Sequence, residues 1–208
     1  MDSTTSTTTT TLAPRILRPT ARRFWTLFGA LVAWLALMSV TPGVIAGAMG
    51  YTGKLQLFAL SNMPGYTPAQ AYADLTTYGS GGRTAYAISL GLFDIVFPLL
   101  YGSVLSVGLR LVTRGFRLSS RAQRIAGVAP FIAVAANWLA DICLVTLLLS
   151  YPSRMTTFVQ VASLLTTIKL VVMMLGFVSL FIGGATLLAR RVGAHVSGHA
   201  ILVSAERN

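Results

Sequence analysis

Acidic residues are nearly missing from this sequence, and charged residues of either sign are scarce. Asp and Glu together number five among 208 residues, and all charged types make up only 10% of the chain, whereas 54% is hydrophobic. Soluble globular proteins are about one quarter charged. This composition excludes an ordinary soluble domain and indicates a protein whose main solvent is lipid.

Cysteine and histidine are also scarce, which narrows the available chemistry. The single cysteine, Cys143, cannot form an intrachain disulfide, and its apolar neighbours favour a buried structural thiol. His195 and His199 have a spacing that zinc ligands use, but no cysteine, glutamate or third histidine accompanies them, so no metal site is predicted. No histidine falls within the apolar runs, which argues against a haem held among them.

The common catalytic motifs are absent. The sequence contains no P-loop, nucleophile elbow, zinc-protease motif or paired-cysteine motif, and its only glutamate is Glu206. An enzyme would have to use aspartates, one lysine and tyrosines, which permits acid–base chemistry without indicating it. The sequence therefore favours a protein that is not an enzyme, and any cofactor is unknown.

Four long apolar runs dominate the remaining sequence. They cover about 24–49, 84–112, 125–150 and 156–189, and a transmembrane helix needs about 20 apolar residues. The first run is about twice as long as the core of a secretory signal, which favours an uncleaved span. We therefore predict an all-α integral membrane protein, a bundle of four transmembrane helices with both termini in the cytoplasm.

The connections between the runs divide the chain further. Residues 1–23 are predicted to be a disordered, Thr/Ser-rich tail that ends in arginines, residues 24–191 the membrane domain, and residues 192–208 a second tail. In the long outer connection, Thr67 and Pro68 predict the start of a short amphipathic helix reaching about Tyr78, which Gly79-Ser80-Gly81-Gly82 should end. The fourth run exceeds the bilayer thickness, so its helix should tilt or protrude.

The arginines indicate the orientation of the bundle. Of fourteen arginines, twelve lie in the N-terminal segment, the 110–124 loop and the C-terminal segment. The positive-inside rule places these segments in the cytoplasm, where arginines contact anionic lipid headgroups. This arrangement also explains the net charge of +11 without nucleic acid as a partner.

Three ionisable residues lie within the spans, where they are functional candidates. Asp94 and Asp141 are each about ten residues below the outer end of their spans, or about 15 Å, and Lys169 is about 20 Å below the start of its span. Three helices thus place a charged group at a similar depth. We expect the three side chains to meet.

Residues on the same helical faces extend this polar cluster. Asn137 shares a face with Asp141, and Tyr101 and Pro98 share a face with Asp94. Because Pro98 has no N–H group, the carbonyl of Asp94 loses its normal helical partner. Two carboxylates and one ammonium leave a formal charge of −1, which favours a ligand site over a pair that only sets helix register.

Part of the chain resembles a known family. The residues concerned are Gly65-Tyr66-Thr67-Pro68, Gly82-Arg83-Thr84-Ala85-Tyr86 and Phe93-Asp94-Ile95-Val96-Phe97-Pro98-Leu99-Leu100-Tyr101-Gly102. This stretch, about a quarter of the chain, resembles a family of small bacterial four-span membrane proteins that has no assigned activity. The resemblance implies the four-span architecture and a bacterial plasma membrane, but it implies no function.

Three functions are consistent with these features. The first is a non-enzymatic bundle whose polar centre binds or passes a small amphipathic ligand, an ion or a proton. The second is an accessory subunit of a larger complex, whose small-residue faces pack against partner membrane proteins. The third is an intramembrane enzyme that modifies a lipid.

Overall fold

The computed structural model describes residues 21–51 and 59–205. The side chains of residues 59, 191 and 194–205 lie outside this description. The expectations for residues 1–20 and for the side chains of His195 and His199 lie outside the described residues. Within the described part the chain folds into helices without strands. Four stretches are long and apolar enough to cross a membrane, namely Ala21–Ala48, Val96–Gly115, Ser120–Ser150 and Thr156–Arg190. The prediction of an all-α, four-span membrane protein is confirmed.

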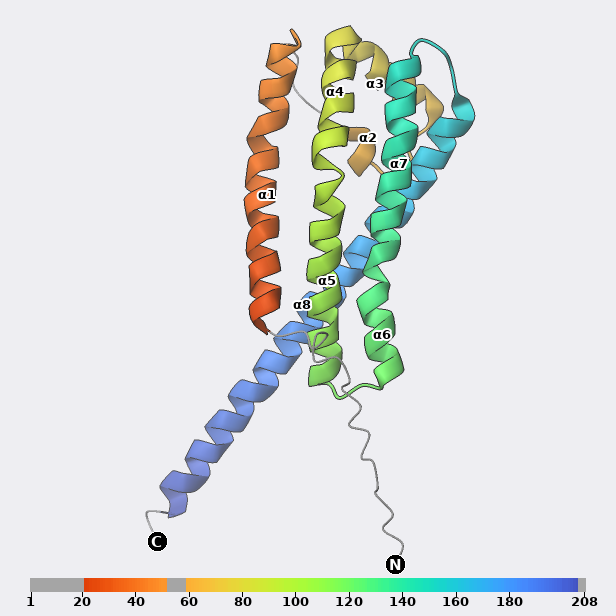
Figure 1. Cartoon of the computed structure of the whole chain (residues 1–208). Helices are drawn as coiled ribbons and strands as arrows, with labels where there is room; N and C mark the ends of the chain where they lie inside the picture. Colours follow the sequence, from red (N-terminus) through yellow and green to blue (C-terminus); the bar gives the residue numbers. More distant parts are fainter. Residues whose placement is uncertain (1–20, 52–58, 206–208) are drawn as a thin grey trace, which may run out of the picture.

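Eight described helices make up the bundle. They are α1 (Ala21–Ala48), α2 (Ala59–Asn62), α3 (Pro68–Thr77), α4 (Gly79–Phe93), α5 (Val96–Gly115), α6 (Ser120–Val128), α7 (Pro130–Ser150) and α8 (Thr156–Ala205). Figure 1 shows α5 continuing the line of α4, and α7 continuing that of α6. The start of α1, the α5–α6 connection and the far part of α8 lie at one end of the bundle, which we call the arginine-rich end. The opposite end, which carries α3, is called the α3 end.

The second span is interrupted at its centre. The sequence predicted one helix over 84–112, but α4 ends at Phe93 and α5 begins at Val96. Pro98 explains the break, because a proline cannot donate to the carbonyl four residues earlier and its ring crowds that carbonyl. The indole nitrogen of Trp138 on α7 donates to the carbonyl of Ile95 at 3.2 Å. A side chain from a neighbouring helix thus satisfies backbone that the break exposes.

Two expected loops are helical, and both expectations were wrong. Gly79-Ser80-Gly81-Gly82 follows the end of α3, as predicted, but it was placed in the outer connection, whereas it forms the first turn of α4. A Cβ atom on Gly82 would lie 2.9 Å from the ring of Tyr51, so this glycine allows α4 to approach the end of α1. Residues 110–124 are helical except for 116–119, because arginine is a good helix former and its stem can lie on apolar surface.

The amphipathic helix of the outer connection forms as predicted. Thr67 caps α3, its hydroxyl accepting from the Gln70 backbone at 3.3 Å, while the Gln70 side chain accepts from the Thr67 backbone at 2.8 Å. The Tyr72 hydroxyl donates to the carbonyl of Ser153 at 3.3 Å. Arg83 of α4 stacks over the Tyr151 ring at 4.0 Å and donates to the carbonyl of Leu75 in α3 at 3.0 Å. These contacts fasten α3 across the connection between α7 and α8.

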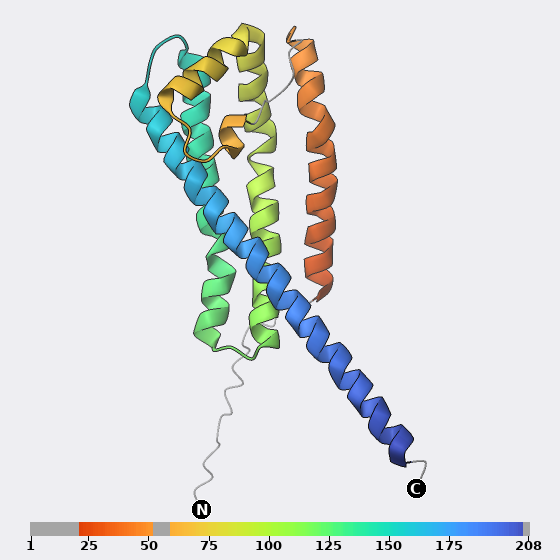
Figure 2. The ribbon, with the colours of Figure 1, turned by 180° about the vertical axis from the view of Figure 1, so that it is seen from behind.

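Helix α8 crosses the bundle at an angle and extends beyond it at the arginine-rich end (Figure 2). This agrees with the expectation that the long fourth run tilts or protrudes. The helix continues to Ala205, so the expected C-terminal tail is helical as far as that residue.

Leucine and valine side chains from α5 and α8 fill notches left by glycines on the opposite helix. The four pairs are Leu105 with Gly176, Leu180 with Gly108, Val112 with Gly183 and Leu187 with Gly115. Each helix contributes its glycines seven residues apart, so the notches recur after two turns on one face. Small residues at helix crossings let backbones approach closely in lipid, where packing replaces the hydrophobic effect. This crossing sets the position of α8, and therefore of Lys169, against α5.

Candidate functional site

All six residues predicted from the sequence for the polar cluster are buried. The exposed fractions are 5% for Asp94, 1% for Tyr101, 1% for Asn137, 8% for Asp141 and 4% for Lys169, and Pro98 is also buried. They come from the α4–α5 break, α5, α7 and α8. Residues of this polarity are seldom fully buried unless they have partners or a function.

The structure brings these side chains together at the centre of the bundle. The charges of Asp94, Asp141 and Lys169 interact with one another, and Tyr101 interacts with both carboxylates. Asn137 donates from Nδ2 to Oδ2 of Asp141 at 2.5 Å, one turn along the same helix. The amide therefore orients one oxygen of the carboxylate.

Lys169 is held in a way that the sequence did not predict. Among the described side chains it forms no ion pair with either carboxylate; instead, its ammonium donates to the backbone carbonyl of Ser61 in α2. The last carbonyls of a helix lack intrahelical donors, and Ser61 lies in the last turn of α2. A buried ammonium is a strong partner for such a carbonyl. Lys169 therefore stabilises α2 through a hydrogen bond and also interacts electrostatically with the two carboxylates.

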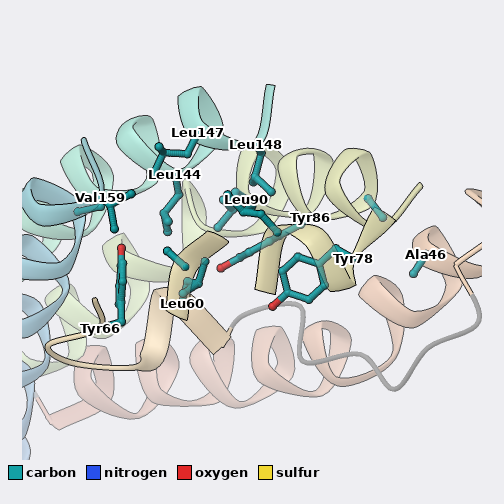
Figure 3. Close-up of a cluster of buried hydrophobic side chains, with 14 residues drawn as sticks. Ala46, Leu60, Tyr66, Tyr78, Tyr86, Leu90, Leu144, Leu147, Leu148 and Val159 are labelled. Atoms are coloured by element: carbon teal, nitrogen blue, oxygen red, sulfur yellow. The ribbon is translucent and has the colours of Figure 1, made fainter. Parts of the chain in front are cut away.

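Helix α2 penetrates to the depth of the polar cluster, although the sequence placed its residues in an outer loop. Lys169 lies thirteen residues into α8, or about 20 Å along the helix axis, and it contacts Ser61 directly. The Tyr86 hydroxyl accepts from the Ser61 backbone at 3.2 Å and lies 3.2 Å from the Ser61 hydroxyl. Figure 3 shows Tyr86 and Leu60 together within the apolar cluster that packs around α2.

Sequence reasoning missed Ser61 because it lies in a connection that was assigned to the surface, and it missed Tyr86, at the start of the predicted second span, because no charge or motif singled it out. One signal was present: Leu55-Gln56-Leu57-Phe58-Ala59-Leu60 is an apolar stretch inside that connection. Non-helical backbone at membrane depth is tolerated where protein buries it. Helix α2 and helix α3 together cover the polar cluster from the α3 end.

A groove with apolar walls reaches the two carboxylates from the side of the bundle. It has a volume of about 590 Å³ and lies between the α4–α5 break and α7. Asp94 and Asp141 lie in its lining, together with Trp138, and its rim includes Ile95, 55% exposed, and Ile142, 63% exposed. Exposed isoleucines in the middle of membrane spans face lipid. The groove therefore connects the carboxylates with the hydrocarbon of the bilayer.

Several buried polar atoms around the cluster have no hydrogen-bond partner among the described residues. They are Asp141 Oδ1, Ser89 Oγ and the hydroxyl of Tyr101. An unsatisfied buried polar atom costs about 1–3 kcal/mol, and more when it is charged. The described residues contain no group of three or more His, Cys, Asp or Glu side chains that could hold a metal. The arrangement suits a molecule, or water, that supplies hydrogen-bond donors to the Asp141 carboxylate.

Comparison with known proteins gives no match: no family model, no curated protein and no solved structure is significantly similar to this chain. The four apolar helices support a multi-pass membrane protein. The resemblance to a bacterial family stays a prediction.

Proposed function

We propose that this protein is a non-enzymatic membrane protein that binds a small amphipathic ligand in the groove between the α4–α5 break and α7. The observation that carries the proposal is the groove itself, whose walls are apolar and whose lining includes Asp94 and Asp141; the buried Oδ1 of Asp141 has no hydrogen-bond partner among the described residues. A hydrocarbon tail matches the walls, and a hydrogen-bond-donating head matches the carboxylate. Ligand pockets commonly combine apolar lining with a few polar groups.

The charge of the cluster favours a cationic head group. Two carboxylates and one ammonium sum to −1 when all are ionised, and Lys169 is already engaged by Ser61. A protonated amine would neutralise the site and donate to Asp141, and charge-assisted hydrogen bonds of this kind are the strong ones. Passage of an ion from the α3 end has less support, because α2 and α3 cover the cluster there.

The ligand would enter from the bilayer. We further propose that the arginine-rich end faces the cytoplasm of a bacterial plasma membrane, following the positive-inside rule. In that orientation the groove opens toward lipid nearer the outer leaflet. An amphiphile in that leaflet reaches the carboxylates by moving its head along the α4–α5 break, without crossing the α3 cap.

Trp138 lines the groove, and its fluorescence can report binding. With Trp25 and Trp34 replaced by phenylalanine, it is the only tryptophan of the chain. Titration of the purified protein in neutral detergent with decylamine should change the Trp138 emission, whereas butylamine and decanol should bind much more weakly. Asp141→Asn should weaken decylamine binding about ten- to a hundredfold, since a hydrogen bond to a charged group contributes about 1.5–3 kcal/mol.

Asp74 provides the matched control for this experiment. It is an aspartate on α3, and partial burial raises the pKa of its carboxyl above the ordinary value, but it lies outside the groove. Asp74→Asn should bind decylamine as the parent does. Equal decylamine affinity of the Asp141→Asn variant and the parent would contradict the proposal. Co-purification with large partner subunits, without a response to any amine, would also contradict it and would favour the role of an accessory subunit.

A double replacement separates ligand binding from helix positioning. Buried charged pairs can often be replaced by apolar residues without loss of stability, so Asp141→Leu with Lys169→Leu should leave a folded protein. If the cluster binds a ligand, this variant should no longer respond to decylamine. A folded double variant that binds decylamine as the parent does would show that these two side chains only position helices.

A further inference from the structure

A second cavity lies at the arginine-rich end, apart from the polar cluster. Its volume is about 890 Å³, and it lies between α1, α5 and α7. Helix α1 contributes Arg22, Arg23 and Thr26, α5 contributes Ser103, and α7 contributes Phe131. With Ser106, also on α5, the cavity combines two guanidinium groups and three hydroxyls with an aromatic wall, and it is large enough for a lipid head group.

The described charged residues at this end of the molecule are arginines. The described carboxylates lie elsewhere, since Asp74 is on α3 and Asp94 and Asp141 are at the centre of the bundle. Arg22 and Arg23 stand in the first turn of α1 and are exposed. Arginine donates to phosphate through a planar, bidentate fork, which makes it well suited to phosphate recognition. The lining therefore favours a phosphate group over a carboxylate or a neutral sugar.

Arg110 adds an independent observation beside the cavity. One turn earlier on α5, Ser106 lines the cavity and donates to the carbonyl of Gly127 at 2.6 Å. The Arg110 guanidinium occupies the space where a side chain at Gly127 would lie, and its buried Nε has no hydrogen-bond partner among the described residues. An unpaired buried guanidinium nitrogen is costly. Ser106 and Arg110 thus both lie against Gly127, so Arg110 adds a positive charge beside the cavity.

The cavity extends from the head-group level into the hydrocarbon region. Ser103 lies twelve residues before Gly115, the last residue of α5, or about 18 Å along the helix axis. Leu27 and Val107 add apolar surface between these levels. A free phosphate ion would leave this apolar part of the cavity empty, whereas the acyl chain of a lipid would fill it.

From these observations we infer that the cavity between α1, α5 and α7 is a binding site for one anionic phospholipid of the leaflet at the arginine-rich end. The phosphate lies between Arg22 and Arg23, with the hydroxyl of Thr26, one turn along α1, within its reach. An acyl chain runs along Leu27 and Phe131. The site does not depend on the groove proposed for the amphipathic ligand.

Native mass spectrometry of the full chain in a neutral detergent tests this inference with defined lipids. At equal added concentrations, phosphatidylglycerol should remain bound about tenfold more than phosphatidylcholine, since the latter carries no net charge. Arg22→Gln with Arg23→Gln should remove this preference. Ser103→Leu, which fills the cavity and keeps every arginine, should reduce phosphatidylglycerol binding by a similar factor.

The matched control is Arg121→Gln with Arg124→Gln. These arginines are exposed on α6 at the same end, so the double change removes the same charge without altering the cavity lining, and phosphatidylglycerol retention should equal that of the parent. Equal losses in both double variants would overturn the inference in favour of a general surface charge. Unchanged binding in Ser103→Leu would overturn the assignment to this cavity. Displacement of the lipid by inorganic phosphate alone would identify a free-anion site instead.

Discussion

Replacing Lys169 with methionine tests what holds α2 at the centre of the bundle. Methionine keeps the approximate length of lysine but removes the ammonium that donates to the Ser61 carbonyl. A buried acceptor left without a donor costs about 1–3 kcal/mol. Asp94 and Asp141 also lose the positive charge that acts on both, and removing one partner of buried charges costs about 3–5 kcal/mol.

Because Lys169 forms no direct ion pair among the described side chains, we expect the total loss to be about 3–5 kcal/mol rather than the sum of both terms. For a chain of 150–250 residues, 1 kcal/mol lowers Tm by about 2–4 °C, so Tm should fall by roughly 6–20 °C. Cys143, the single cysteine and only partly buried, allows a thiol-reactive dye to report unfolding without an engineered label.

Tyr86→Phe is the uncharged control for this measurement. It removes the hydroxyl that contacts Ser61 twice, at 3.2 Å each, but leaves every charge in place. We expect it to cost about 1–3 kcal/mol and therefore to lower Tm less than Lys169→Met does. If the two variants lose the same stability, the charge of Lys169 contributes nothing beyond one hydrogen bond. If Lys169→Met unfolds at the Tm of the parent, the ammonium does not hold α2.

Two further predictions concern the helix crossing and the orientation. Gly183→Ala should destabilise the protein by about 1–3 kcal/mol in thermal unfolding, because the new methyl group collides with the β-branched Val112. The control is the adjacent Gly184→Ala, whose methyl group meets nothing within 4 Å and which should be neutral or slightly stabilising. Equal effects of the two substitutions would contradict the packing described for α5 and α8. In a variant without Cys143, single cysteines introduced at the exposed positions Ser80 and Ser119 should react with an impermeant thiol reagent from opposite sides of the membrane. The cysteine at position 80 should react from outside. Labelling of both positions from one side would disprove the four-span topology.

Individual residues show how far sequence reasoning reached. Thr67 and Pro68 predicted α3 correctly, because a helix cap is a local interaction between residues three apart. Pro98 correctly marked a disturbed backbone at Asp94, since the missing N–H group is a property of proline itself. The break that follows, with α4 and α5 as separate helices, was not predicted.

Glycines were the main source of error. Gly79-Ser80-Gly81-Gly82 has the composition of a linker, and in water these residues would favour a turn. In this bundle they open α4, and Gly81 and Gly82 admit the end of α1. The same residue type either breaks a helix or allows helices to approach, and the neighbouring helix, which the local sequence does not reveal, decides between the two.

The candidate site was also only partly predictable from the sequence. Asp94, Asp141 and Lys169 could be selected from the sequence because a charge in a hydrophobic span is costly wherever its helix packs. Their partners could not, because Ser61 lies 108 positions from Lys169 and no periodicity connects a short inserted helix with a distant span. The groove between α4–α5 and α7 likewise depends on how two helices diverge.

By itself, then, the sequence determined that the chain crosses the membrane four times and which charges lie buried, because hydropathy, helix rise and the cost of a charge in lipid are properties of single segments. Only the tertiary structure decided that Lys169 donates to α2 and that the carboxylates face a groove open to lipid. Those outcomes depend on helix crossing angles and on the insertion of α2, which are set by packing between residues far apart in the chain.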